Sequence, residues 1–240
     1  MVINEMWRGG PKLYGGGAFK IGTDAVLLSA FPSMRGVRRV CDLGSGSGVI
    51  SILLSWNNPQ ITVDGIELQP EAADISNKSA VLCGLDDRVR FICGDIRCHR
   101  DLLSAGAYDL VVSNPPYFPT GSGKSADDAV TATARDERSC TLGDVCQAAG
   151  YLTKYGGRFA MVHRPERLAE VIRAMSKTGL EPKRLRFVQY SASSAPSLFL
   201  IEGRRGGKPS MTVEAPLILT DENGGDSAEI RAIYHREEKK

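Results

Sequence analysis

The sequence predicts one α/β domain, a mostly parallel sheet with helices on both faces. Short apolar runs alternate along the chain with longer amphipathic segments, which is the pattern of strand–helix–strand units. One such run, 37–43, leads directly into a glycine-rich loop at 44–48 and then into a helical segment. This succession puts a loop at the carboxyl end of a parallel strand. With 240 residues, 42% of them apolar, the chain can bury a full core.

Seven strands and six helices are expected along the chain. The strands are predicted at 37–43, 61–66, 89–93, 107–113, 157–163, 184–190 and 197–202, the last two as a hairpin-like pair. The helices are predicted at 25–31, 49–56, 70–83, 142–155, 166–177 and 227–236. Thr23 and Asp24 offer an N-cap to the first helix, although Asp24 also suits the first turn through the helix dipole. Residues 1–22 are expected to form an extended or looped lead-in.

The stretch 110–118, Leu-Val-Val-Ser-Asn-Pro-Pro-Tyr-Phe, ends the fourth strand abruptly. Pro115 and Pro116 have no amide hydrogen and have fixed φ angles, so the strand cannot continue and its last carbonyls stay available. Asn114 adds a side-chain acceptor, and Tyr117 adds a flat ring. A planar substrate with an amino group can stack on the ring and donate both hydrogens to these oxygens. For this stretch alone, a rigid turn without chemistry is the alternative.

The loop at 44–48 narrows the choice of ligand. Its glycines follow Gly-x-Gly-x-Gly, and Val49 stands where the dinucleotide-binding fingerprint needs its third glycine. No Lys-Ser/Thr pair follows the loop, so it is not a phosphate-binding P-loop. Asp42, just before the loop, would repel a pyrophosphate and suits a ligand that carries an ammonium or sulfonium group.

Two further acids follow the next two strands. Glu67 comes about 20 residues after the loop, where a carboxylate can bind a ribose diol. Asp95 can accept a hydrogen bond from the amino group of adenine while the backbone N–H of Ile96 donates to the ring. Each acid alone is more typical of a solvated surface. With Asp42, however, three acids end three successive strands, which predicts a ligand site there.

Positive charge is concentrated in about one fifth of the chain. The net charge is +2, but residues 158–208 hold 11 Lys/Arg against 4 Asp/Glu, a balance of +7. This asymmetry favours a polyanion as partner, with a solvated basic face as the alternative. Arg204, Arg205 and Lys208 carry the most concentrated charge within it.

A long polar stretch, 120–138, separates the fourth strand from the next helix. It is long for a connection, which is typical of a mobile or functional loop. Arg135 and Arg138 close it, and they can hold either a substrate phosphate or a neighbouring acid.

Composition excludes several other classes of function. The six cysteines include no Cys-x-x-Cys pair, and the three histidines (99, 163 and 235) have no ligand spacing, so no metal site is expected. No apolar run reaches about 18 residues, and the N-terminus lacks a signal pattern. We therefore expect a cytoplasmic protein with reduced cysteines and no membrane contact.

Four features stand in order: Asp42-x-Gly-x-Gly-x-Gly, Glu67, Asp95 and Asn114-Pro-Pro-Tyr. Together they resemble the Rossmann-like S-adenosylmethionine-dependent methyltransferases that carry Asn-Pro-Pro-Tyr and methylate exocyclic or amide nitrogens. The nearest resemblance is to the bacterial tRNA adenine N6-methyltransferases that modify a valine tRNA beside its anticodon.

The resemblance extends over nearly the whole chain. Residues 19–28, Phe-Lys-Ile-Gly-Thr-Asp-Ala-Val-Leu-Leu, match that family's opening motif, and 134–137, Ala-Arg-Asp-Glu, match its Ala-Arg-x-Glu element. In the tail, Pro216-Leu217 and the Ser-x-Glu-Ile run at 227–230 also fit. Asp226 departs from the pattern, because similar sequences often have Tyr before that serine.

This resemblance implies a Rossmann-like class I methyltransferase fold, with a seven-stranded, mostly parallel sheet in the order 3-2-1-4-5-7-6. It divides the chain into an N-terminal extension over the cofactor site (1–36), the methyltransferase domain (37–205) and a C-terminal tail (206–240). S-Adenosylmethionine is the implied cofactor, tRNA the implied partner, and no metal is required. The implied cofactor-binding residues are Lys20, Thr23, Asp24, Asp42, Gly44, Ser45, Gly46, Gly48, Glu67, Asp95, Ile96 and Asn114. The implied catalytic residues are Asn114, Pro115, Pro116 and Tyr117. The expected substrate-binding residues are Tyr117 and Phe118, for stacking, and the arginines and lysine Arg135, Arg138, Arg204, Arg205 and Lys208; the last three follow from the charge of the basic segment 183–208, which we expect to face the RNA.

Three alternative functions stay open. Asn-Pro-Pro-Tyr can also present a glutamine amide, as in the family that methylates release factors. That family usually carries an N-terminal helical domain, for which the residues before position 37 leave no room. Methylation of DNA adenine or of a guanine amine in ribosomal RNA is harder to exclude. The third alternative is a non-catalytic RNA-binding module, against which the intact Asn114, Glu67 and Asp95 argue.

Overall fold

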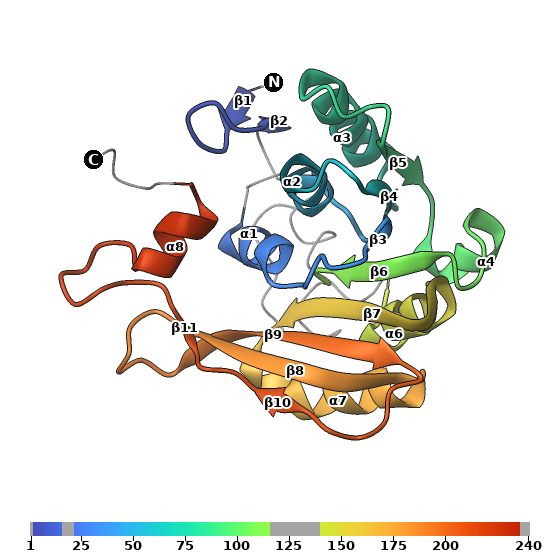
Figure 1. The fold of residues 1–240 in the computed structure, drawn as a ribbon. Coiled ribbons are helices and arrows are strands. Elements are labelled where there is room, and N and C mark those ends of the chain that lie inside the picture. Colours follow the sequence, from blue (N-terminus) through green and yellow to red (C-terminus); the bar gives the residue numbers. More distant parts are fainter. Residues whose placement is uncertain (1, 16–21, 116–139, 236–240) are drawn as a thin grey trace, which may run out of the picture.

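The computed structural model describes residues 2–15, 22–115 and 140–235, and most of them surround one central sheet (Figure 1). Its parallel strands are β3 (Arg39–Leu43), β4 (Thr62–Glu67), β5 (Val89–Cys93), β6 (Tyr108–Ser113) and β7 (Thr153–His163). The strands that complete the sheet are β8 (Leu180–Gln189), β9 (Pro196–Arg205), β10 (Thr212–Val213) and β11 (Leu217–Ile218).

The order across the main part of the sheet is β5-β4-β3-β6-β7-β9-β8, which is the predicted order 3-2-1-4-5-7-6. The first five strands in this order, β5, β4, β3, β6 and β7, pair in parallel, whereas β9 runs antiparallel to both β7 and β8. The predicted hairpin-like pair is therefore confirmed. Among the described residues the sheet has nine strands rather than the predicted seven, because the short strands β10 and β11 both pair with β8.

Helices cover both faces of this sheet (Figure 1). α1 (Thr23–Ala30), α2 (Val49–Asn57) and α3 (Pro70–Leu82) lie on one face, and α6 (Leu142–Leu152) and α7 (Leu168–Lys177) lie on the other. The remaining short helices are η1 (Ile96–Cys98), α4 (His99–Leu102), η2 (Pro165–Arg167) and α8 (Ala228–Ile233). Each face has its own buried core, so the sheet is covered on both sides as a parallel sheet requires. Within the described ranges, no helix has the length and apolarity needed to cross a membrane.

Several element boundaries differ from those predicted: β7 and β8 begin four residues earlier and β9 ends three residues later, and the ends of two helices also shift. α1 begins at Thr23 with Gly22 as its N-cap, so the prediction that Thr23 and Asp24 cap this helix is wrong. Both residues lie inside the first turn, where the Asp24 carboxylate accepts the Ala25 N–H at 2.9 Å. α6 ends three residues earlier than predicted, because Thr153 is already extended and pairs in the sheet.

The N-terminal residues form a β-hairpin rather than the expected lead-in. β1 (Val2–Glu5) pairs antiparallel with β2 (Lys12–Gly15). The hairpin packs on α3, because Leu13 is buried and the Tyr14 N–H donates to Ser79 Oγ at 3.0 Å. Two four-residue strands in a glycine-rich, polar stretch give too little alternation to be read from sequence.

The C-terminal residues pack back onto the domain. Ser227 caps α8, since its Oγ accepts the Ile230 N–H at 3.2 Å, and Ile230 is buried. The rings of Trp7 and His235 stack with their centroids 4.3 Å apart, so the N-terminal hairpin and the residue after α8 touch. The placement of domain boundaries at 37 and 205 stays a prediction.

Candidate active site

The parallel strands end together at one edge of the sheet, termed here the carboxyl edge. The strand ladders set Leu43 beside both Ile66 and Ser113, and Glu67 beside Cys93. The segments that leave β3, β4, β5 and β6 are therefore neighbours. They carry the loop 44–48, Glu67, Asp95 and Asn114, as predicted.

The three glycines of the loop have different functions. Gly44, Gly46 and Gly48 have φ angles of +71°, +54° and +76°, which favour glycine. A Cβ at Gly44 or Gly46 would meet no described atom within 4 Å, whereas at Gly48 it would lie 2.6 Å from the Phe91 ring. The first two glycines therefore leave room beside the backbone for a ligand, and packing requires the third. The Gly44 N–H donates to the Ile66 carbonyl at 3.0 Å, which holds the loop against β4.

Replacing Gly48 with alanine is expected to cost more stability than replacing Gly44. Both substitutions put a side chain at positive φ, which costs about 1–2 kcal/mol. Only Gly48→Ala adds a clash with Phe91, for which roughly 1–3 kcal/mol more is expected. Urea unfolding of the two variants and the parent protein measures the difference. Equal losses for both variants would mean that the Phe91 ring moves aside without cost.

Asp42 is a fully buried carboxylate beneath the loop. Its Oδ2 accepts a hydrogen bond from Ser51 Oγ at 2.8 Å, while no described group donates to its Oδ1. Burial raises the pKa of Asp42 to about 7, the Ser51 hydrogen bond opposes this rise, and the charge of Glu67 adds to it. A buried carboxylate with one oxygen lacking a donor fits a cationic ligand group, which would favour the ionised form.

Glu67 is also buried, and backbone groups fix both of its oxygens. The Gly46 N–H donates to Oε2 at 2.8 Å, and the Gln69 N–H donates to Oε1 at 2.9 Å. Each oxygen has a further lone pair, so the carboxylate can still accept from a diol. Glu67 thus has two functions, since it orders the glycine loop through Gly46 and presents acceptors beside it.

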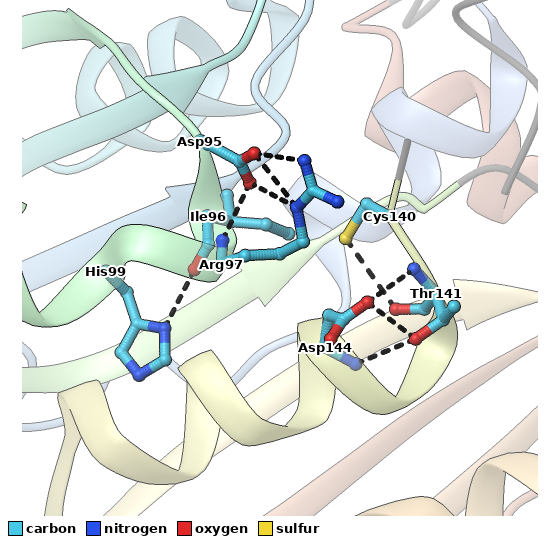
Figure 2. A network of polar contacts seen from close by, with 7 residues as sticks. All are labelled: Asp95, Ile96, Arg97, His99, Cys140, Thr141 and Asp144. Atoms are coloured by element: carbon cyan, nitrogen blue, oxygen red, sulfur yellow. Dashed lines mark hydrogen bonds and ion pairs between the residues drawn. The ribbon is translucent and has the colours of Figure 1, made fainter. Parts of the chain in front are cut away.

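Asp95 follows β5 and is bound by a residue that the sequence patterns did not single out (Figure 2). The backbone N–H of Arg97 donates to Asp95 Oδ1 at 2.9 Å, and the guanidinium binds both carboxylate oxygens. These hydrogen bonds from Arg97 lower the pKa of Asp95. Ile96 is buried, and its carbonyl lies 2.8 Å from Nδ1 of His99. An Asp two residues before an Arg was the available signal, but such spacing is common on exposed turns.

Asn114 and Pro115 begin where β6 ends. The hydroxyl of Ser113 donates to the Leu43 carbonyl at 2.8 Å, which fastens the end of β6 to the strand that carries the glycine loop. Asn114 is half-buried and Pro115 is buried. Asn114 and Pro115, the predicted acceptors for an amino group, therefore follow the strand next to β3, which carries Asp42 and leads into the loop 44–48.

Comparison with known proteins identifies the family to which the chain belongs. Residues 9–176 match the methyltransferase small domain family. The chain belongs to that family. The methyltransferase is 29% identical to a tRNA1(Val) (adenine(37)-N6)-methyltransferase of Tolumonas auensis, over 90% of this chain and 88% of that protein. It is 32% identical to the protein of the same name from Porphyromonas gingivalis, over 79% of this chain and 76% of that protein. The resemblance inferred from the motifs is confirmed.

Solved structures support the class I methyltransferase fold. A predicted O-methyltransferase from Agrobacterium tumefaciens has a TM-score of 0.72 and 18% identity, and the match covers 89% of the methyltransferase and 96% of that chain. A geranyl diphosphate C-methyltransferase from Streptomyces coelicolor, in complex with S-adenosyl-L-homocysteine, has a TM-score of 0.50 and 18% identity. That match covers 70% of this chain and 71% of the other. At such identities the similarity concerns the fold alone.

Several predicted site residues of the methyltransferase are not part of this geometry. Thr23 and Asp24 lie in the first turn of α1, which packs on α2 and β7, and Ser45 is buried in the loop. Their contacts with a cofactor stay predictions. The predicted residues outside the described ranges are Lys20, Pro116, Tyr117, Phe118, Arg135 and Arg138.

The structure does not bring Arg204, Arg205 and Lys208 to the carboxyl edge. β9 runs antiparallel, so its last residues lie where the parallel strands begin, with Arg204 opposite Arg158 of β7. Arg204 Nε donates to the Gly156 carbonyl at 3.1 Å, and Arg205 donates to two backbone carbonyls. The direction of β9 carries these residues to the edge opposite Asn114, and their contact with the substrate stays a prediction.

Other basic residues of the 158–208 segment are held in ion pairs. Arg184 Nε lies 2.7 Å from a Glu214 oxygen, and its Nη1 lies 3.5 Å from Glu202. Arg186 binds both oxygens of Glu229 at 2.6 and 2.7 Å. The local excess of positive charge is therefore smaller than the composition of the segment indicated, because acids from the tail neutralise part of it.

His163 is a second residue near the site to which the sequence patterns assigned no role. It ends β7 and is fully buried, and its Nδ1 accepts the Arg164 N–H at 2.8 Å. Burial lowers the pKa of His163 to about 4, so the ring is neutral at physiological pH. Burial of a single histidine depends on tertiary packing and has no sequence signal. Among the described residues of the methyltransferase, no group of three or more His, Cys, Asp or Glu side chains is arranged to hold a metal ion.

Proposed function

We propose that this methyltransferase transfers a methyl group from S-adenosylmethionine to the exocyclic N6 of an adenine in tRNA. One observation carries the proposal. Asn114 and Pro115 follow β6 directly beside β3, the strand that leads into the loop 44–48. Acceptors for an amino group and a loop suited to a cationic cofactor therefore adjoin at the same edge of the sheet.

The residues of the carboxyl edge fit S-adenosylmethionine, which supplies an electrophilic methyl group on a sulfonium when it is bound. Asp42 has an oxygen that no described group fills, and it can offset the ligand's positive charge. The loop 44–48 leaves room for close approach of the ligand to the backbone. Glu67 can accept from the ribose hydroxyls, and Asp95 with the Ile96 N–H can bind the adenine ring.

The oxygens of Asn114 and Pro115 activate and hold the substrate amine. An adenine amino group is a weak nucleophile, because its lone pair is delocalised into the ring. Accepting its two hydrogens draws N6 toward a tetrahedral geometry and stabilises its positive charge as the N–C bond forms. The same contacts align N6 with the methyl–sulfur bond. Sulfur leaves with the bonding pair as a neutral thioether, so no side chain has to protonate it, and N6 then releases one proton to solvent.

An anticodon-loop adenine is the proposed substrate. The relatives bear the name tRNA1(Val) (adenine(37)-N6)-methyltransferase, and nucleotides of such loops can be splayed out at low cost. Tyr117 and Phe118 would stack on the extruded base. Adenine in DNA, an amine in ribosomal RNA and a protein glutamine are the alternatives, since any planar NH2 group suits the two acceptors. With tRNA as partner, the cytoplasm is the proposed compartment.

Transfer of labelled methyl from S-adenosylmethionine into total tRNA of a strain lacking this protein tests the proposal. We expect label in one valine tRNA, and nucleoside mass spectrometry should identify it as N6-methyladenosine. Label in ribosomal RNA, DNA or protein instead would mean that the substrate is not tRNA, while the proposed methyl transfer to an amino group would stand. Absence of label from all four, with cofactor binding also absent in calorimetry, would leave the non-catalytic RNA-binding alternative.

The RNA-facing surface is proposed on the side of Asn114 away from the cofactor residues. β7 follows β6 across the sheet, with Ser113 beside Met161. The register sets Asn114 level with Val162, so Arg164 lies one strand across and two residues further along, roughly 8 Å from Asn114. Its side chain is exposed, and its backbone N–H is held by His163. An arginine in this position can bind a phosphate of the loop.

Tyr190 lies further along the same edge. It follows β8, whose Val188 pairs with Leu198 of β9 near the carboxyl end of β7. The carbonyl of Tyr190 accepts both the N–H and the hydroxyl of Thr220, at 2.9 and 2.7 Å, while its side chain is 62% exposed. An exposed ring on a fixed backbone is suited to stack on a base that neighbours the target adenine.

Removing the Tyr190 ring is expected to weaken tRNA binding. We expect Tyr190→Ala to raise the Kd for tRNA about tenfold, since stacking on an aromatic ring is a large contribution per base. Tyr155→Ala is the matched control, because Tyr155 is 82% exposed at the start of β7, at the opposite edge. Arg164→Glu should also lower the salt slope of binding by about 1, and Lys208→Glu should not. Fluorescence anisotropy over a range of salt concentrations measures both, and larger effects in the two controls would place the RNA at the other edge.

A further inference from the structure

Arg97 holds the carboxylate of Asp95 from two directions (Figure 2). Its backbone N–H donates to Oδ1 at 2.9 Å, which also makes Asp95 the N-cap of η1. Its Nε lies 3.0 Å from Oδ1 and 2.9 Å from Oδ2, and its Nη2 lies 2.5 Å from Oδ2. A planar fork of this kind fixes the direction of both carboxylate oxygens, which a single lysine could not do.

We infer that Arg97 is a positioning residue that makes the cofactor site selective for a 6-aminopurine. The inference rests on the proposed function, in which Asp95 accepts a hydrogen bond from the amino group of the cofactor's adenine. An ionised carboxylate has about four lone-pair directions. The backbone N–H and Nη2–H of Arg97 each take one of them, and Nε–H is shared between the two oxygens, so the direction from which Asp95 accepts the adenine amino group is fixed.

A fixed, ionised carboxylate discriminates between purines. Hydrogen bonds from Arg97 lower the pKa of Asp95, so its carboxyl group carries no proton to donate. A 6-oxopurine would therefore set its oxygen against an oxygen that can only accept, and the two would repel. Without Arg97 the carboxylate could rotate into water. The binding free energy would then depend less on whether the purine carries an amino group or an oxygen at position 6. The side chain of Asp95 keeps 23% of its surface exposed, so such a rotation is open to it.

The neighbouring acid does not compete for Arg97. The hydrogen bond to Asp95 raises the pKa of Arg97, and the charge of Asp144, at the start of α6, adds a smaller effect in the same direction. Its Oδ2, however, accepts the Thr141 N–H at 2.9 Å and the Thr141 hydroxyl at 2.7 Å, in the capping box of α6 (Figure 2). Because Asp144 is committed to that helix end, the guanidinium of Arg97 is left to Asp95.

Cofactor binding without RNA tests this inference. The variant is Arg97→Gln, which removes the fork and the charge but keeps the backbone N–H. Arg100→Gln is the matched control, since Arg100 is an exposed arginine three residues on whose guanidinium lies over the Tyr151 ring, 5.0 Å from its centroid. Calorimetry would compare S-adenosylhomocysteine with S-inosylhomocysteine, which has a 6-oxo base, on all three proteins. Thermal unfolding of each protein controls for folding.

We expect Arg97→Gln to bind S-adenosylhomocysteine about tenfold more weakly, as for the loss of one charge-assisted contact. The preference of Arg97→Gln for S-adenosylhomocysteine over S-inosylhomocysteine should fall by a similar factor. Arg100→Gln should bind both ligands as the parent protein does. With an RNA substrate, KM for the cofactor should rise while kcat stays within about twofold. An unchanged preference, even with weaker binding of both ligands, would reduce Arg97 to a structural residue and overturn the inference. Failure of the parent protein to bind S-adenosylhomocysteine would instead overturn the proposed function.

Discussion

Replacing Asn114 with alanine is expected to lower the rate of methyl transfer by about a hundredfold to a thousandfold, as for the loss of one group that stabilises transition-state charge. The side-chain oxygen of Asn114 accepts one of the two amino hydrogens in the proposed mechanism. Its contribution grows as N6 becomes positive, so the loss should fall on kcat. The dissociation constant of S-adenosylmethionine should change little, because the residues proposed to hold the cofactor, Asp42, Glu67 and Asp95, come from other strands. Single-turnover transfer and calorimetry measure the two quantities.

Ser113→Ala is the control for damage to the end of β6. It removes the hydroxyl that donates to the Leu43 carbonyl, one residue before Asn114, without touching the proposed acceptors. We expect this variant to lose some stability and to keep a rate near that of the parent protein. Equal losses of transfer and of cofactor binding in Asn114→Ala would mean that Asn114 holds the cofactor rather than the substrate amine.

Replacing Asp42 with asparagine is expected to weaken cofactor binding and to change its pH dependence. The pKa of Asp42 is about 7 in the protein without ligand, because the carboxyl is buried. A cationic ligand favours the carboxylate and so lowers this pKa, which means that binding releases a proton below about pH 7. Affinity of the parent protein should therefore fall as the pH drops below 7, by at most about tenfold per pH unit.

Asparagine cannot ionise, so Asp42→Asn should bind the cofactor more weakly and lack this component of the pH dependence. The amino group of S-adenosylmethionine titrates in the same range, but its contribution is shared by both proteins. The difference between their affinities at pH 6, 7 and 8 isolates Asp42. A difference that is constant over this range would show that the Asp42 proton is not linked to binding.

The same substitution is expected to stabilise the protein without ligand at alkaline pH. The unfolded chain loses the Asp42 proton near pH 4, whereas the folded protein keeps it until about pH 7. The stability contribution of this group therefore falls as the pH rises through that window, and it stays low above pH 7. The total is up to about 4 kcal/mol. Urea unfolding at pH 8 should show Asp42→Asn to be the more stable protein, with the advantage shrinking toward pH 5.

The arrangement of the sheet could be predicted because its signals are local. Glycines at 44–48 and prolines at 115 and 116 restrict the backbone at two strand ends, whatever packs around them. Buried parallel strands appear as short apolar runs, and the resemblance to a known family supplied their order. Both the convergence of Asp42, Glu67, Asp95 and Asn114 and the strand order could therefore be predicted from the sequence.

The weaker predictions depended on contacts between residues far apart in the chain. The N-terminal hairpin needs α3 to pack on, and its own eight strand residues carry little pattern. The cap of α1 moved by one residue to Gly22, because polar residues at a helix start fit both the cap and the first turn. Charge along 158–208 overstated the positive surface, since Glu214 and Glu229 return from the tail to neutralise Arg184 and Arg186.

The class of chemistry followed from the sequence alone, because an amino-group acceptor, a glycine loop and strand-end acids are short motifs that parallel strands bring to one edge. Only the tertiary structure showed at which edge of the sheet each charged residue lies and which carboxylate oxygens already accept hydrogen bonds. Antiparallel β9 carries Arg204 away from Asn114, burial leaves Asp42 with an oxygen that no described group fills, and Arg97 closes on Asp95. Strand direction, burial and side-chain pairing act through space, and sequence spacing does not contain them.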